Sequence, residues 1–211
     1  MNKQPAGEEA DDIVLVGLGN PGPDYASTRH NLGAVCLDEL GRRLGVDSSR
    51  RRWRSQVGSA QLEGPGGDRR VWLLWPQTYM NLSGRAVAAA AKDLRIPPAQ
   101  VWVVHDELDL PLCRLRIRRG GSDAGNNGVA SIISALGSSD FVRFRVGVGK
   151  PPSAKAGVRY VLGRFTRAEA AAVESVARGV AAALEEALRR GLERAMELYN
   201  RSGSLGCEEL K

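Results

Sequence analysis

The stretch that most constrains the fold runs from an apolar segment into a loop rich in glycine and proline. Residues 13–16 (Ile-Val-Leu-Val) are apolar and branched, which predicts a buried strand. The next seven residues, Gly-Leu-Gly-Asn-Pro-Gly-Pro, disfavour a helix, because proline fixes φ and glycine weakens helical backbone. Polar side chains then gather in a short space, namely Asn20, Tyr25, Arg29, His30 and Asn31. Reactive groups on a loop at the carboxyl end of a strand indicate the functional site of an α/β protein.

The same loop matches the dinucleotide-binding pattern G-x-G-x-x-G at Gly17, Gly19 and Gly22. That pattern requires a helix that begins directly on the glycines, so that its amino end faces a pyrophosphate. Here a proline follows the last glycine and interrupts any helix. The acidic residues about 20 positions further on, Asp38 and Glu39, fall inside an amphipathic segment. A nucleotide-binding enzyme is therefore a disfavoured alternative.

Composition sets the class of protein and the expected compartment. The chain has 211 residues, 43% apolar and 26% charged, as in water-soluble proteins with a buried core. No apolar run reaches the length of a membrane span, and the polar start lacks the apolar region of a signal peptide. Cys36, Cys113 and Cys207 are an odd set without the spacing of zinc ligands. We therefore expect neither a disulfide framework nor a metal site, and the cytoplasm as compartment.

Strand-like and helical segments alternate along the chain, which predicts an α/β fold. We expect a single domain over residues 13–200, with a twisted mixed β-sheet flanked by helices, a disordered tail over 1–12 and a frayed end over 201–211. Besides the first strand, strands are expected at 57–62, 71–75, 101–104, 114–118 and 141–148, the first two of these as an antiparallel hairpin. Helices are expected at 32–44, 84–95 with Ser83 as N-cap, 129–136, and 166–200 with a break at Gly191.

Several loops that follow predicted strands carry groups suited to hydrolysis. If the strands lie parallel, one crevice collects His30, Asp106 and a set of amides: Asn20, Asn81, Asn126 and Asn127. A neutral imidazole can take a proton from water at pH 7, and a carboxylate on its other nitrogen fixes the tautomer. Amide N–H groups can stabilise an oxyanion. No Ser or Cys lies in a nucleophile-elbow setting, so we expect activated water rather than a covalent intermediate, and we expect His105 to pack in the core.

Five motifs resemble those of the bacterial-type peptidyl-tRNA hydrolase family, in the order of that family. They are residues 16–22 (Val-Gly-Leu-Gly-Asn-Pro-Gly), 28–33 (Thr-Arg-His-Asn-Leu-Gly), 78–84 (Thr-Tyr-Met-Asn-Leu-Ser-Gly), 105–111 (His-Asp-Glu-Leu-Asp-Leu-Pro) and 141–151 (Phe-Val-Arg-Phe-Arg-Val-Gly-Val-Gly-Lys-Pro). The resemblance covers about residues 13–200. It implies a monomeric, cytosolic α/β enzyme without metal or other cofactor. Such an enzyme cleaves the ester between a peptide and the 3′ ribose of tRNA, and so recycles tRNA from aborted translation.

The resemblance also implies roles for individual residues. By position in the matching motifs, His30 is the base and Asp106 its orienting carboxylate. Asn20 contacts the peptide part and helps to reject unblocked aminoacyl-tRNA. The substrate site is lined by Tyr25, Tyr79, Met80, Asn81, Asn126 and Asn127.

Two positions depart from the family pattern. Asn126 stands where the family usually has histidine, and asparagine can form hydrogen bonds but cannot titrate. Cys113 stands where glycine is usual, so a positive φ there would strain the turn by about 1–2 kcal/mol. We expect Asn126 to weaken activity or alter substrate contact. A catalytically weakened homologue that acts as an RNA-binding protein is therefore the main alternative function.

Basic residues fit a tRNA partner. The net charge is +6, and Arg116, Arg118 and Arg143 lie on two predicted strands, with Lys150 beyond the second. We expect them to hold acceptor-stem phosphates, which positions a nucleic acid without reading its bases. A solvated sheet edge is the alternative. For the arginine-rich residues 50–54, a solvated connection is favoured over a binding patch.

Overall fold

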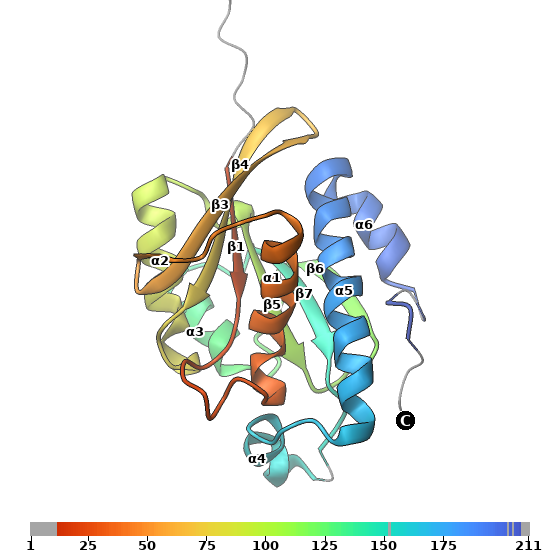
Figure 1. Ribbon diagram of the computed structural model, residues 1–211. Coiled ribbons are helices and arrows are strands. Elements are labelled where there is room, and N and C mark those ends of the chain that lie inside the picture. Colours follow the sequence, from red (N-terminus) through yellow and green to blue (C-terminus); the bar gives the residue numbers. More distant parts are fainter. Residues whose placement is uncertain (1–11, 152, 202, 204, 208–211) are drawn as a thin grey trace, which may run out of the picture.

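The computed structural model describes residues 12–151, 153–201, 203 and 205–207, and within them one seven-stranded sheet forms the centre (Figure 1). Its strand order is β2-β3-β4-β1-β5-β7-β6. The strands are β1 (Ile13–Gly17), β2 (Arg50–Arg52), β3 (Ser55–Gly64), β4 (Gly67–Pro76), β5 (Val101–Glu107), β6 (Leu115–Arg119) and β7 (Val142–Gly147). The α-helices are α1 (Leu32–Arg43), α2 (Ser83–Leu94), α3 (Asn127–Leu136), α4 (Gly157–Val161), α5 (Arg167–Arg190) and α6 (Leu192–Tyr199). Short 3₁₀ turns are η1 (Arg29–Asn31), η2 (Met80–Leu82), η3 (Pro98–Gln100) and η4 (Ala154–Ala156).

The sheet is mixed, and its parallel part positions the loops. Strand β1 pairs in parallel with β4 and β5, and β5 pairs in parallel with β7. The carboxyl ends of these four strands therefore meet at one edge. At the other side of the sheet, β3 and β4 form the expected antiparallel hairpin, which closes at Gly64 and Gly67. The predicted α/β fold is confirmed, including the edge where the polar loops converge.

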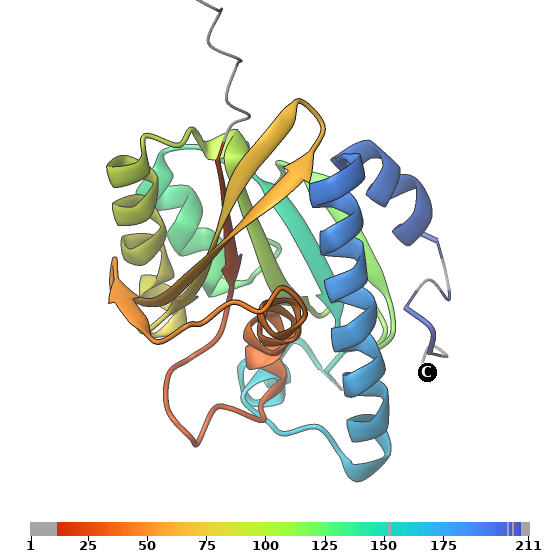
Figure 2. The same cartoon turned by 45° about the horizontal axis from the view of Figure 1, so that its top comes forward.

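Helices cover both faces of the sheet and bury two apolar cores (Figure 2). Helices α1, α5 and α6 pack on one face, with Leu37, Val180 and Leu184 fully buried against it. Helices α2 and α3 pack on the other face around residues such as Val87 and Ile132. The apolar spacing of three and four residues that predicted these helices is the same spacing that turns one face of each to the core. No helix among the described residues is long and apolar enough to cross a membrane.

Two local expectations were wrong, and a third was incomplete. Strand β5 runs three residues past the predicted end, so Asp106 lies inside the strand and pairs with Val146 rather than standing on a loop. Ser83 does not cap α2, because η2 leads straight into the helix, and the Ser83 hydroxyl is buried inside the first turn. Residues 50–52 are exposed, as a solvated segment would be, but they form the edge strand β2, whose Arg52 pairs with Asp93 at 2.5 Å. For β5, pairing with the distant strand β7 decided the local structure, whereas β2 pairs with the neighbouring strand β3.

The expectation of no disulfide was also wrong. Cys113 and Cys207, 94 positions apart, form a disulfide, while Cys36 is free and buried. An odd number of cysteines does not prevent two of them from pairing once the fold brings them together. Leu205, within the end that is predicted to fray, is buried against Gly179. The predictions for residues 1–11, 202, 204 and 208–211 concern positions outside the described residues.

Reduction of this disulfide is expected to lower the thermal unfolding midpoint by roughly 5–15 °C. A bond that closes so long a loop typically contributes about 2–4 kcal/mol, mainly by restricting the unfolded chain, and in a chain of this size each kcal/mol moves the midpoint by about 2–4 °C. Differential scanning fluorimetry with and without reductant measures the shift. In Cys207→Ser the midpoint should already be low and should not respond to reductant. An unmoved midpoint in the native protein would contradict this prediction.

Candidate active site

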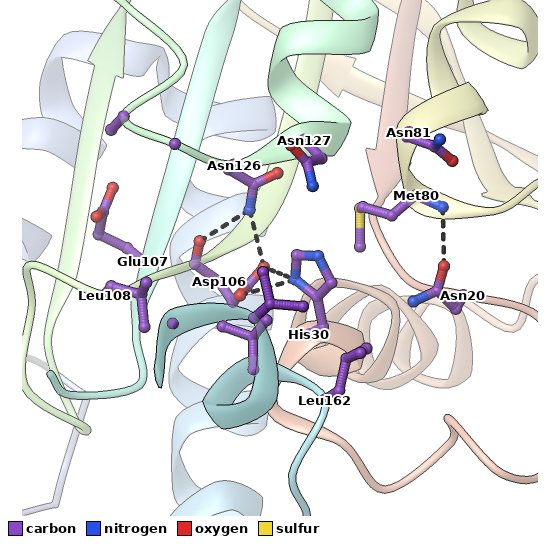
Figure 3. Close-up of a pocket in the computed structure, with 15 residues that line it drawn as sticks. Asn20, His30, Met80, Asn81, Asp106, Glu107, Leu108, Asn126, Asn127 and Leu162 are labelled. Carbon is purple, nitrogen blue, oxygen red and sulfur yellow. Dashed lines mark hydrogen bonds and ion pairs between the residues drawn. The ribbon is translucent and has the colours of Figure 1, made fainter. Parts of the chain in front are cut away.

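A cleft of about 410 Å³ lies at the carboxyl edge of the parallel strands (Figure 3). Its walls come from the loop after β1, from η1 and η2, from the end of β5, from the start of α3 and from α4. The residues lining it are Asn20, His30, Met80, Asn81, Asp106, Glu107, Leu108, Ala124, Gly125, Asn126, Asn127, Gly157, Val158, Val161 and Leu162. Seven of the residues selected from sequence therefore converge on one cavity.

His30 and Asp106 form a hydrogen-bonded pair in this cleft. Nδ1 of His30 lies 2.9 Å from both carboxylate oxygens of Asp106. Because a carboxylate accepts hydrogen bonds, Nδ1 carries the proton and Nε2 is left as the basic nitrogen. The Asp106 side chain is only 2% exposed, whereas the His30 ring is 10% exposed. The arrangement suits removal of a proton from water, with Asp106 stabilising the imidazolium that forms.

The turn that carries His30 is tied, through the side chain of Arg29, to residues 160–169. Arg29, next to His30, donates to the Arg164 carbonyl at 2.7 Å and to both oxygens of Glu169 at 2.8 and 3.1 Å. Its guanidinium also lies 4.4 Å from the centre of the Tyr160 ring. These contacts join η1 to the segment that carries α4. They fix both the turn that carries His30 and one wall of the cleft.

Asn20 is held in place by the side chain of Asn31 and by the backbone of Met80. Asn31 accepts from the Asn20 backbone N–H and donates to its carbonyl, both at 2.9 Å. The Asn20 side-chain oxygen accepts from the Met80 backbone N–H at 2.8 Å. This leaves the side-chain nitrogen of Asn20 as a donor facing the cleft, on the side of His30 (Figure 3).

Helix α4 supplies a cleft wall that the sequence did not predict. Val158 and Leu162 are 68% and 40% exposed although they are apolar, and both line the cleft with Val161. A weak signal was present, because the three residues recur at spacings of three and one before the Thr166 cap. The segment is too short for periodicity to identify a helix.

Not all predicted substrate residues line the cleft. Tyr25 and Tyr79 do not line the cleft. They pack edge to face on each other, with ring centres 6.4 Å apart. Asn81 and Asn127 line the cleft and are exposed, and Met80 lines it while buried. The asparagines are thus open to a ligand, whereas the tyrosines form a separate pair.

The arginines divide into exposed and buried groups. Arg116 and Arg118 are exposed on β6, as the alternation predicted. Arg143 is 2% exposed, and its guanidinium donates to the carbonyls of Gly121 and Ser122. Burial, together with the neighbouring arginine charges, lowers the pKa of Arg143. Its donors hold the loop before α3, so its placement argues against the predicted phosphate contact.

The two titratable residues on either side of Asp106 in sequence bond to groups other than its carboxylate. His105 packs on the opposite face of β5, as predicted, and burial lowers its pKa. Its Nδ1 donates to the Asp106 carbonyl at 2.9 Å. Glu107 is 3% exposed and pairs with Arg145 at 2.8 Å. This buried pair was not anticipated, because the two residues lie 38 positions apart.

The structure shows what Cys113 and Asn126, the two residues that depart from the family pattern, do in the fold. Cys113 has φ of +70°, which is the left-handed conformation that favours glycine, and its side chain forms the disulfide with Cys207. Asn126 is the N-cap of α3 and also donates to Asp106. Among the described residues, no three His, Cys, Asp or Glu side chains are placed to hold a metal ion.

The fold and the cleft together define a single-domain α/β protein with a paired histidine and aspartate in an open cleft. The particular family follows from comparison with known proteins. The family model of peptidyl-tRNA hydrolase matches residues 14–205, and the chain belongs to that family.

Peptidyl-tRNA hydrolases from other organisms are similar to this protein over nearly the whole chain. Peptidyl-tRNA hydrolase of Chloroflexus aurantiacus is 46% identical over 188 residues, which are 89% of this chain and 98% of that protein. The enzyme of Mycobacterium sp. (strain KMS) is 45% identical over 192 residues, with 90% and 98% covered. The crystal structure of peptidyl-tRNA hydrolase from Acinetobacter baumannii matches with a TM-score of 0.79 at 28% identity, covering 97% of this chain and 99% of that one.

Proposed function

We propose that this protein hydrolyses the ester between the peptide, or an N-blocked amino acid, and the 3′ ribose of tRNA. The observation that carries the proposal is the His30–Asp106 pair at 2.9 Å in the cleft of a chain of this family. Nε2 of His30 takes a proton from water as that water attacks the ester carbonyl. The imidazolium then gives the proton to the departing 3′ oxygen. Asp106 holds the ring in the required tautomer throughout.

The choice of water as nucleophile is supported by the lining of the cleft. No serine, threonine or cysteine occurs among the described residues that line it. The tetrahedral intermediate carries a negative oxygen, which amide N–H donors stabilise by about 10²–10³ in rate for each donor. Asn20 and Asn127 are the amides that we assign to the substrate, Asn20 to the peptide part.

The tRNA contacts are assigned to exposed positive charge. Arg116 and Arg118 on β6 and Lys150 beyond β7 are exposed, and we propose that they contact acceptor-stem phosphates. Tyr25, in the loop before η1, and Tyr79, directly before η2, are proposed to contact the 3′ end. We further propose that the enzyme acts as a monomer in the cytoplasm, needs no cofactor, and recycles tRNA from aborted translation.

The decisive assay is release of N-acetyl-amino acid from N-acetyl-aminoacyl-tRNA in EDTA, beside unblocked aminoacyl-tRNA. We expect rapid release from the blocked substrate only. No release, despite tRNA binding that weakens steeply with salt, would replace this proposal by the RNA-binding alternative. Release that requires a divalent metal would contradict the metal-free mechanism.

A further inference from the structure

Both polar atoms of the Asn126 side chain are used within the protein. Its oxygen accepts from the backbone N–H groups of Gly128 at 3.0 Å and Val129 at 3.2 Å, which caps α3. Its nitrogen donates to Asp106, at 2.9 Å to Oδ1 and 3.2 Å to the carbonyl. The residue is 9% exposed. The side chain therefore has little hydrogen-bonding capacity left for a substrate, which argues against the substrate contact predicted for it.

The orientation of this amide is fixed by its partners. The two N–H groups at the start of α3 can only donate, so the oxygen must face them. The nitrogen must then face Asp106, whose carboxylate can only accept. One side chain thus joins the amino end of α3 to the buried carboxylate that holds His30 (Figure 3).

We infer that Asn126 is a positioning residue, whose Nδ2 donor fixes the Asp106 carboxylate and through it the protonated Nδ1 of His30. The inference rests on the proposed function for its catalytic meaning. The expected effect on the charge of the His30–Asp106 pair does not depend on the proposed function, because it concerns only these two side chains. A neutral donor shares the negative charge of Asp106 between two hydrogen bonds, and so limits how strongly the carboxylate holds a proton on the ring.

The charged groups around His30 and Asp106 are few and already paired, so the effect of Asn126 on this pair can be measured by itself. Among the described residues lining the cleft, the titratable side chains are His30, Asp106 and Glu107. Glu107 is paired with Arg145 on β7, and Arg29, beside His30, is paired with Glu169 on α5. Helix α4 contributes apolar side chains and a glycine to the cleft. Substitution of Asn126 therefore changes the donor to Asp106 while the neighbouring ion pairs keep their partners.

Three variants separate capping from positioning. Asn126→Ser keeps an N-cap oxygen of comparable strength, but its side chain is too short to donate to Asp106. Asn126→Ala loses both contacts. Asn126→Asp keeps the cap and replaces the donor by a second carboxylate oxygen next to Asp106. If Asn126 only caps α3, Asn126→Ser should behave as the native protein does.

We expect Asn126→Ser to unfold at a midpoint below that of the native protein but above that of Asn126→Ala, because it loses the bond to Asp106 and keeps the cap. Its KM should stay within about twofold of the native value, and its kcat should fall about 10- to 100-fold, as loss of a hydrogen bond to a charged group costs. The acidic limb of its pH–rate profile should move to higher pH, because Asp106 then holds the protonated ring more strongly. Asn126→Asp should move the limb further. Native kcat and an unmoved profile in Asn126→Ser would overturn the inference, as would a raised KM with unchanged kcat.

A measurement without substrate separates this inference from the proposed function. The chain has only two histidines, so ¹H–¹³C NMR of the ring signals follows each one, with His30→Ala providing the assignment. In Asn126→Ser the His30 signal should complete its titration at higher pH than in the native protein, and the His105 signal should not follow it. This comparison stands even if the protein proves not to hydrolyse peptidyl-tRNA. A His30 signal that titrates as in the native protein would overturn the inference.

Discussion

Asp106→Asn is expected to lower the rate of peptidyl-tRNA hydrolysis by about 10³–10⁴-fold. In the native protein the Asp106 carboxylate accepts from Nδ1 of His30 at 2.9 Å and from Asn126 at 2.9 Å. An asparagine amide presents one oxygen and one donor nitrogen in place of two acceptors. With Asn126 donating to the oxygen, the new nitrogen faces the ring. The ring then shifts its proton to Nε2 and loses the basic nitrogen that takes the proton from water.

The matched control for this change is Asp109→Asn. Asp109 lies three residues further on, its side chain is 66% exposed, and its nearest cation, Lys150, is 3.6 Å away. Such an exposed pair contributes little, so the control should hydrolyse substrate at close to the native rate. Both variants should bind tRNA as tightly as the native protein in a filter-binding assay. His30→Ala should be at least as slow as Asp106→Asn, because the two residues act as a unit. Near-native turnover in Asp106→Asn would refute the mechanism.

Gly33→Ala is expected to destabilise the protein by about 3 kcal/mol and to disrupt the His30–Asp106 pair. A Cβ on Gly33 would lie 2.3 Å from the Val104 carbonyl oxygen and 2.9 Å from the backbone N and O of Leu18. These are backbone atoms of the central sheet and of the loop after β1, so they cannot move aside cheaply. Helix α1 must shift away from β5, and it carries η1 and His30 with it. A displacement of about 1 Å at such a site costs roughly 10²-fold in rate.

Gly41→Ala, on the same helix, is the control for this prediction. There the nearest atoms to a new Cβ are at the tip of the Trp75 ring, 3.4 Å away. Alanine is also favoured over glycine inside a helix by about 1 kcal/mol. Urea unfolding should therefore find Gly41→Ala as stable as the native protein or more so, with native activity. Equal stabilities for the two variants would show that the α1–β5 contact is looser than described.

Much of the fold could be predicted from local pattern. The apolar run before Gly17 and the 3.6-residue period of α1 and α5 are set by neighbours in sequence, so they predicted elements that the structure contains. The hairpin of β3 and β4 also followed from its glycine-rich turn. The identities of His30 and Asp106 as a pair followed from chemistry, since the chain has only two histidines and one of them stands on the glycine-rich loop.

Other features depended on partners that local pattern does not reveal. Residues 105–107 are polar and looked like a loop, yet pairing with β7 keeps them in β5. Arg143 looked like an exposed phosphate ligand, yet the loop before α3 folds over it and takes its donors. Cys113 and Cys207 are separated by 94 positions, and only the packing of the C-terminal segment brings them together.

The sequence by itself determined the family and most of the strands and helices, without β2 and α4, and it selected His30 and Asp106 as a pair. Tertiary structure alone decided their geometry, because His30 and Asp106 come from elements 76 residues apart and meet only when α1 packs on β5. It also gave Asn126 its place between a helix cap and a carboxylate. Periodicity and motifs report the preferences of neighbouring residues. Hydrogen bonds between residues distant in sequence form only when folding brings those residues together.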